Sequence, residues 1–260
     1  MTLNKNGLII YQGPSLLDGM PIVAIVTGLT TKSANSKTGA ELQTWIIRSD
    51  ISPRAALDSG ADASICGDCP HRPKTIVELI RGVLKTRTVR TCYVRIDNAP
   101  RAVYECYKRG NYATADFDDM IDNGHDLYDR VLRIGSYGDP AAVPVSVWDT
   151  MAGLCAHHTG YTHQWRTHQS LAHLCMASVD SVGERAEAKL RGFRTFRPRG
   201  SNEQIWANEI SCPASEEAGR KTTCENCKLC SGTSSNSPKS ITIQIHGPVS
   251  NAIKSAGIAA

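Results

Sequence analysis

The stretch Val131-Leu-Arg-Ile-Gly-Ser-Tyr-Gly-Asp-Pro140 opens the part of the sequence that decides the fold. Its first four residues are a short apolar run, as in a buried strand, and the glycines after them predict a turn. Strand and helix patterns then alternate: a helix from Pro144 to Gly160, strands at 161–165 and 175–179, and a helix that begins with a capping box of Ser181 and Glu184. Such units form mostly parallel sheets, so we predict an α/β fold whose core is a partial (β/α) barrel.

Four segments are predicted around and within this core. Residues 1–60 contain two β-branched apolar runs, at 22–27 and 42–47, which indicate an N-terminal β-hairpin followed by a short helix capped by Ser52. Residues 61–200 are expected to form the α/β core with a first cysteine cluster. Residues 201–234 are expected to form a C-terminal cysteine-rich metal-binding appendage, and residues 235–260 a final strand and tail.

Composition limits the classes of protein that fit. A chain of 260 residues, 41% of them hydrophobic, can bury a core without disulfide bridges, so its ten cysteines favour metal binding in a reducing cytoplasm. We predict no membrane partner, because no apolar run approaches the roughly 18–20 residues that cross a bilayer. The net charge of +4 permits a small-molecule or a nucleic-acid partner. We expect Cys106, Cys155 and Cys175 to act as small hydrophobic residues.

The segment Cys224-Glu-Asn-Cys227-Lys-Leu-Cys230 carries a thiol at every third position, and Cys212 lies twelve positions before it. Thiols spaced in this way cannot pair with one another without strain, but they can converge on one inorganic centre. We therefore predict that these four cysteines bind a metal. Spacing of this kind favours an iron–sulfur cluster over zinc, since zinc sites more often use two separate Cys-x-x-Cys pairs.

A second candidate metal site starts with the pair Cys66-Gly-Asp-Cys69. We expect Cys92 to be its third ligand. His71 is a candidate fourth ligand, which would favour zinc, whereas three thiolates alone would leave one iron of a cluster open. A redox-active dithiol is less favoured, because no thioredoxin-like βαβ pattern surrounds the pair.

Polar and glycine residues follow three of the predicted strands, where ligands bind in parallel sheets. We predict that a cofactor is bound by residues of these three strand ends, namely Gly135, Ser136, Gly138, Asp139, Trp165 and Ser178. His163 and Asp180 are the candidate catalytic residues. Three of these assignments have a structural alternative. Gly138-Asp-Pro140 could be a turn that caps the next helix, His163 could form a structural hydrogen bond, and Asp180 could start the next helix.

The order of these motifs resembles that of a group of uncharacterised bacteriophage proteins with two cysteine clusters. The resemblance rests on the Cys-x-x-Cys pair before Cys92-Tyr, on the segments 135–140, 160–165 and 176–181, and on the final Cys-Pro…Cys-x-x-Cys-x-x-Cys pattern, and it covers about residues 20 to 247. It implies a location in the cytoplasm of a bacterial host and no particular activity.

More distantly, the layout resembles that of radical SAM enzymes, which combine a partial (β/α) barrel with a three-cysteine loop and a glycine-rich motif after the second strand. The resemblance implies that Cys66, Cys69 and Cys92 hold a 4Fe–4S cluster, that residues 135–139 receive S-adenosylmethionine, and that the last four cysteines hold an auxiliary cluster. It also implies a substrate near His163, Trp165 and Asp180. This sequence departs from the family's compact Cys-x-x-x-Cys-x-x-Cys loop, because its third thiol lies far downstream.

The rival interpretation is a non-enzymatic zinc protein. Zinc sites with four cysteines, or with three cysteines and a histidine, contribute on the order of 10 kcal/mol to folding. The basic segments 74–90 and 191–199 would then contact nucleic-acid phosphates or a protein partner. Few aromatic residues accompany these segments, which disfavours single-stranded nucleic acid.

Overall fold

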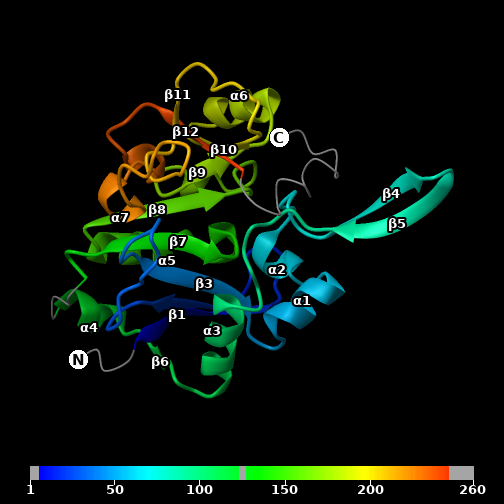
Figure 1. Cartoon of the computed structure of the whole chain (residues 1–260). Helices are drawn as coiled ribbons and strands as arrows, with labels where there is room; N and C mark the ends of the chain where they lie inside the picture. Colours follow the sequence, from blue (N-terminus) through cyan, green and yellow to red (C-terminus); the bar gives the residue numbers. More distant parts are fainter. Residues whose placement is uncertain (1–5, 123–126, 246–260) are drawn as a thin grey trace.

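A single ten-stranded sheet forms the body of the protein in the computed structural model, which describes residues 6–122 and 127–245 (Figure 1). The strand order is β11-β12-β10-β9-β8-β7-β3-β2-β1-β6. The strands are β1 (Gly7–Pro14), β2 (Pro21–Thr27), β3 (Leu42–Arg48), β6 (Ala113–Thr114), β7 (Val131–Tyr137), β8 (His157–Thr162), β9 (Met176–Ser178), β10 (Thr195–Arg199), β11 (Glu209–Ser211) and β12 (Ser240–Gln244).

The sheet is mostly parallel, which confirms the predicted α/β class. Strands β3, β7, β8, β9, β10 and β12 are consecutive neighbours in the order of the chain, and each pair is parallel. The sheet has two edges, at β11 and β6, and no closed barrel forms within the described residues. The carboxyl ends of the parallel strands therefore share one edge of the sheet.

Helices connect the strands. They are α1 (Pro53–Ser59), α2 (Ala63–Cys66), α3 (Ala99–Lys108), α4 (Phe117–Asp122), α5 (Val145–Leu154), α6 (Val182–Leu190) and α7 (Cys224–Cys227), with the short 3-10 turns η1 (Pro140–Ala142), η2 (Gln169–Leu171) and η3 (Gly232–Ser234). Trp148 of α5 is completely buried and its Nε1 donates to the Pro140 carbonyl (2.9 Å), so the helix is fixed to the turn after β7. None of the helices in the described part of the chain has the length and hydropathy of a membrane span.

The predicted N-terminal hairpin is present, since β2 and β3 are antiparallel neighbours. A strand that we did not predict, β1, pairs with β2 and extends the sheet with the buried side chains of Leu8, Ile9 and Ile10. The short helix α1 starts as expected, because the Ser52 hydroxyl accepts from the Ala55 N–H (3.2 Å).

Two helix boundaries test the predictions near the strand ends. The Ser181 hydroxyl accepts from the Glu184 N–H (3.1 Å) as predicted, while the Glu184 carboxylate accepts from Asp180 N–H (2.7 Å) instead of Ser181 N–H. The predicted end of a helix at Gly160 is wrong, because α5 stops at Leu154 and Gly160 lies within β8. A Cβ at Gly160 would lie 2.7 Å from Cys175 Sγ, so this glycine lets β8 approach the segment before β9.

A second, two-stranded sheet projects away from the body (Figure 1). It is the hairpin of β4 (Lys74–Ile80) and β5 (Val83–Val89), which lies between Cys69 and Cys92 in the chain. At the base of this hairpin, the Cys92 N–H donates to the His71 carbonyl (3.1 Å). The hairpin therefore leaves and re-enters the body beside the first candidate metal site.

Candidate functional site

The loop with Cys66 and Cys69 is fastened to the carboxyl ends of β7 and β8. The Asp139 N–H donates to the Ile65 carbonyl (2.6 Å), and the Gln164 side-chain amide donates to the Cys66 carbonyl (3.1 Å). Gly67 has a positive φ of 59°, and a Cβ there would lie 2.5 Å from the Gln164 Cδ. The glycine between the two cysteines thus allows the loop to lie directly on the strand ends.

Backbone hydrogen bonds place three cysteines near one another here, since the Cys69 N–H donates to the Cys66 carbonyl (3.2 Å) and the Cys92 N–H donates to the His71 carbonyl (3.1 Å). Cys66, Cys69 and Cys92 are here called the first thiol set. Burial raises the pKa of Cys66, and the neighbouring Cys69 and Cys92 thiols raise it further. Burial raises the pKa of Cys69 to about 12, and again Cys92 contributes. The backbone at Cys92 therefore lies beside the loop of the Cys66–Cys69 pair, but the three sulfur atoms do not all lie within 4.8 Å of one another.

The glycine-rich segment at the end of β7 and directly after it, residues 135–138, has an internal structural role. A Cβ at Gly138, whose φ is 83°, would lie 2.6 Å from the Ile46 Cβ, so this turn packs tightly on β3. The Gly135 φ is also positive, at 71°, and the Ser136 hydroxyl donates to the Gln43 side chain (2.7 Å).

Asp139 is buried and receives three hydrogen bonds from the protein itself. Its carboxylate accepts from the Ala141 N–H (3.0 Å), the Thr162 hydroxyl (2.8 Å) and the His163 N–H (2.7 Å). Burial raises the pKa of Asp139, against the effect of these donors. The geometry is that of the turn-and-cap alternative, in which Asp139 ties the end of β7 to the end of β8.

Trp165 and Ser178 lie inside the protein. The Trp165 side chain is 1% exposed and packs with Val179 and Phe193, and its Nε1 donates to the Ser178 carbonyl (2.9 Å). The Trp165 ring is thus part of the core. It does not lie on the exposed rim formed by the carboxyl ends of the parallel strands, where we expected a cofactor.

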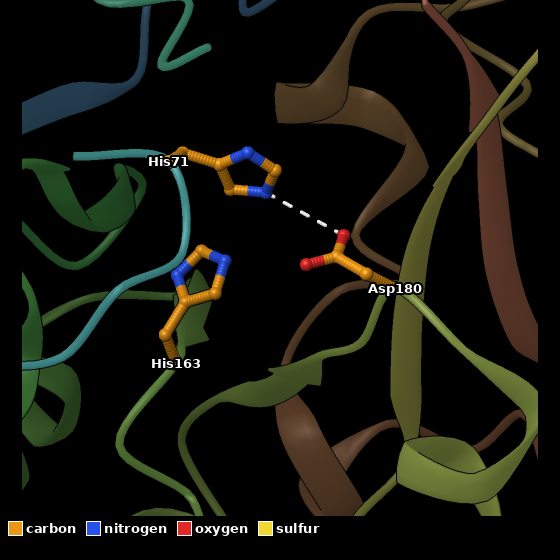
Figure 2. A group of neighbouring side chains, drawn as sticks. All are labelled: His71, His163 and Asp180. Atoms are coloured by element: carbon orange, nitrogen blue, oxygen red, sulfur yellow. Dashed lines mark ion pairs between the residues drawn. The ribbon is translucent and has the colours of Figure 1, made fainter. Parts of the chain in front are cut away.

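His163 and Asp180 do meet at the rim, and His71 joins them (Figure 2). One ligand atom from each of the three side chains lies within 4.8 Å of the other two. His71 Nε2 is 3.5 Å from Asp180 Oδ1, and the rings of His71 and His163 are 5.3 Å apart in an edge-on arrangement. His71 lies two residues after Cys69 and its carbonyl accepts from the Cys92 N–H, so the three residues lie beside the first thiol set.

Four thiols line a separate cavity beside β8. They are Cys212, Cys224, Cys227 and Cys230, here called the second thiol set. The cavity is small, about 10 Å³, and Tyr161 of β8 forms one wall. Burial raises the pKa of Cys230 to about 12 against a hydrogen bond from Tyr161, and raises that of Cys224 to about 11.

Several residues outside the thiol motif hold this set in place. The Arg194 guanidinium donates to the carbonyls of Leu229 (2.8 Å) and Gly232 (2.8 Å) on either side of Cys230. The Cys224 N–H donates to the Lys37 carbonyl (2.8 Å), and the Glu225 carboxylate accepts from the Ala40 N–H (2.9 Å). The loop before β3 therefore holds the cysteine-rich segment through these two hydrogen bonds.

The sulfur atoms of both thiol sets are more widely spaced than ligands of one zinc ion. Four thiolates around a zinc ion with bonds of about 2.3 Å lie about 3.8 Å from one another. Among the described residues, which include all ten cysteines, no three sulfur atoms lie within 4.8 Å of one another.

Comparison of the chain with protein-family models, with curated proteins and with solved structures found no match. Functional inference therefore depends on the geometry of the site.

Proposed function

We propose that this chain is an iron–sulfur protein that acts as a radical SAM-like enzyme. The observation that carries the proposal is that the loop of Cys66 and Cys69, with the backbone of Cys92 hydrogen-bonded beside it, lies on the carboxyl ends of parallel strands. Six parallel strands follow one another in chain order, with the cysteine loop after the first and a glycine-rich turn at the end of the second, and this order supports a relation to the partial (β/α) barrel of radical SAM enzymes.

The residues of the first thiol set fit a 4Fe–4S cluster with one open iron. Three thiols supply three of the four ligands, and buried thiols with raised pKa values need a cationic centre to lose their protons at neutral pH. When bound and reduced, such a cluster supplies one electron to S-adenosylmethionine, which yields methionine and a deoxyadenosyl radical that removes a hydrogen atom from the substrate.

The chain's own residues would hold and shield this centre. Asp139 and Gln164 fix the cysteine loop to the strand ends, and the Gly138 turn fixes both to β3. Because Asp139 is engaged by three protein donors, the backbone of residues 135–138 is the better candidate for contact with S-adenosylmethionine. His163 and Asp180 stand at the same rim, where a substrate would be placed.

The second thiol set would carry an auxiliary cluster. Its four thiols line one cavity and have no histidine among them, so all four corners of a 4Fe–4S cluster would have a cysteine ligand. Such a centre has no iron open to a ligand and would stabilise the fold or conduct electrons.

A zinc protein that binds nucleic acid is the second candidate. The β4–β5 hairpin supports it, because it extends from the body with Lys74, Arg81 and Lys85, and a β-ribbon of this kind fits the major groove. The other basic segment does not help, because Arg194, Arg197 and Arg199 are buried; Arg197 pairs with Glu209 (2.9 Å) inside the protein.

Anaerobic purification tests the proposal. We expect a brown protein with about four iron and four sulfide ions for each thiol set, which releases deoxyadenosine from S-adenosylmethionine on reduction. A colourless protein with stoichiometric zinc and no sulfide would contradict it, and salt-dependent DNA binding by that protein would support the second candidate.

A further inference from the structure

The side chains of His71, His163 and Asp180 converge from three separate segments of the chain (Figure 2). His71 lies in the loop before β4, His163 directly follows β8, and Asp180 follows β9 by two residues. Because β8 and β9 are parallel neighbours, their ends lie side by side, and the cysteine loop brings His71 over them. The convergence is therefore a product of the tertiary fold and not of a local turn.

The histidine rings have the orientation of metal ligands. His71 Nδ1 is 2.8 Å from the Thr91 hydroxyl, which leaves Nε2 facing Asp180. A hydrogen bond on the far nitrogen is the usual means of orienting a metal-bound imidazole. His163 is held through its backbone N–H, which donates to Asp139, and within the described residues no hydrogen bond engages its ring.

Charge and burial suit a cation at this place. The side chains of His71 and Asp180 are 12% and 16% exposed, so a bound ion would be shielded but reachable. The three ligand atoms lie within 4.8 Å of one another, and Asp180 would supply a negative charge to the ion.

We propose that His71, His163 and Asp180 bind a divalent first-row transition-metal ion, in a centre distinct from both thiol sets. Two imidazoles and one carboxylate are a ligand set used for zinc, iron(II), manganese and cobalt, and they leave positions open for water or a substrate oxygen. Magnesium and calcium fit less well, since they prefer oxygen ligands alone. The proposal goes beyond the iron–sulfur function and does not depend on it.

The surface of the protein offers a matched control. His173 Nε2 and Asp149 Oδ1 are 2.7 Å apart, closer than His71 and Asp180, yet both side chains are 49% exposed and no third ligand joins them within the described residues. His173 thus has a histidine–aspartate contact without a third ligand, whereas His163 belongs to a group of three. A variant at His173 therefore tests whether such a contact alone binds the ion.

Titration of the full chain with Mn²⁺, followed by the loss of the free-ion EPR signal, tests the proposal. Mn²⁺ prefers nitrogen and oxygen ligands to thiolates, so the thiol sets compete little. We expect one site per chain in the wild type and in His173→Gln, and an affinity at least about tenfold lower in His163→Gln and Asp180→Asn. Circular dichroism of each variant establishes that it is folded.

Equal binding by Asp180→Asn, His163→Gln and the wild type would overturn the proposal. Co²⁺ supplies a second readout, because thiolate ligands give an intense near-ultraviolet charge-transfer band that a site of two histidines and an aspartate lacks. If all Co²⁺ binding shows this band, is lost in Cys69→Ala and is unchanged in His163→Gln and Asp180→Asn, the ion lies at the thiols and the proposal is overturned. Iron and sulfide analysis of the same samples reports separately on the iron–sulfur function.

Discussion

The two thiol sets differ in what surrounds them. The first set has three cysteines at the end of the parallel strands, with His71, His163 and Asp180 beside it. The second set has four cysteines in a cavity whose walls are mainly apolar, fixed from outside by Arg194 and by the loop before β3. If both proposed centres form, three ligands next to titratable groups would suit reaction with a further ligand, whereas four ligands in an apolar cavity would suit a closed, stabilising centre.

Cysteine variants test this difference with the largest expected effects. Cys230→Ala should remove the second centre and strongly destabilise the fold, because a structural metal contributes on the order of 10 kcal/mol. Cys66→Ala should remove the first centre and S-adenosylmethionine cleavage with a much smaller loss of stability. Iron content, cleavage and thermal unfolding measure these effects.

Cys106→Ala is the control for both variants, since Cys106 belongs to neither set and is only partly buried in α3. If Cys66→Ala and Cys230→Ala lost equal amounts of stability and iron, the functional distinction between the two thiol sets would be wrong.

A glycine variant tests whether the turn beside the first set is a packing device. Gly138→Ala should cost about 2–4 kcal/mol, because the new Cβ meets Ile46 and the φ of 83° is unfavourable for alanine. Gly19→Ala is the matched control: its φ is 78° and no atom lies within 4 Å of the new Cβ, so only about 1 kcal/mol is expected. Chemical denaturation measures both, and equal costs would show that the contact with Ile46 is unimportant.

The two regions should also respond to pH in opposite directions, by about 1–3 kcal/mol each. Burial raises the pKa of Glu41, next to the second set, from 4.5 to about 7, so the folded state holds a proton that the unfolded state releases. Stability is then lost as pH rises from about 4.5 to about 7. His163 near the first set has its pKa lowered from 6.5 to about 4, so stability is lost as pH falls through that range.

Urea unfolding between pH 4 and pH 8, with chelator present, measures these contributions. Glu41→Gln should stabilise the protein at pH 8 and have little effect near pH 4, and His163→Gln should reduce the loss of stability below pH 6.5. Parallel curves for each variant and the wild type would show that these groups do not titrate as inferred.

Short-range patterns predicted much of the fold. The apolar runs at 131–134 and 175–179 and the turns between them were sufficient for a parallel α/β sheet, because each run becomes a buried strand. They did not predict β1, and they placed Gly160 at a helix end because a glycine inside a strand gives the same local signal as a helix stop. The reason for that glycine, the sulfur of Cys175, is fifteen residues away.

The candidate site was predictable to the extent that ligands repeat locally. The spacing of Cys224, Cys227 and Cys230 is visible in the sequence, whereas the supports of both thiol sets are not. Arg194 and Gln164 donate to carbonyls 35 and 98 residues away, and such contacts leave no periodic trace. Trp165 illustrates the reverse error, since an aromatic residue after a strand looks available to a ligand although its indole is satisfied by the Ser178 carbonyl.

The projecting hairpin lies between Cys69 and Cys92 in the chain. Its length does not affect the distance between these two cysteines in space. The residues at its base, Lys74 and Val89, are paired with each other, so the chain enters and leaves the hairpin at the same place whatever its length. A longer or shorter hairpin, or one with different side chains, would therefore leave the distance between Cys69 and Cys92 in space unchanged. The number of residues between Cys69 and Cys92 in the sequence therefore reflects the length of the hairpin and not the geometry of the proposed metal site.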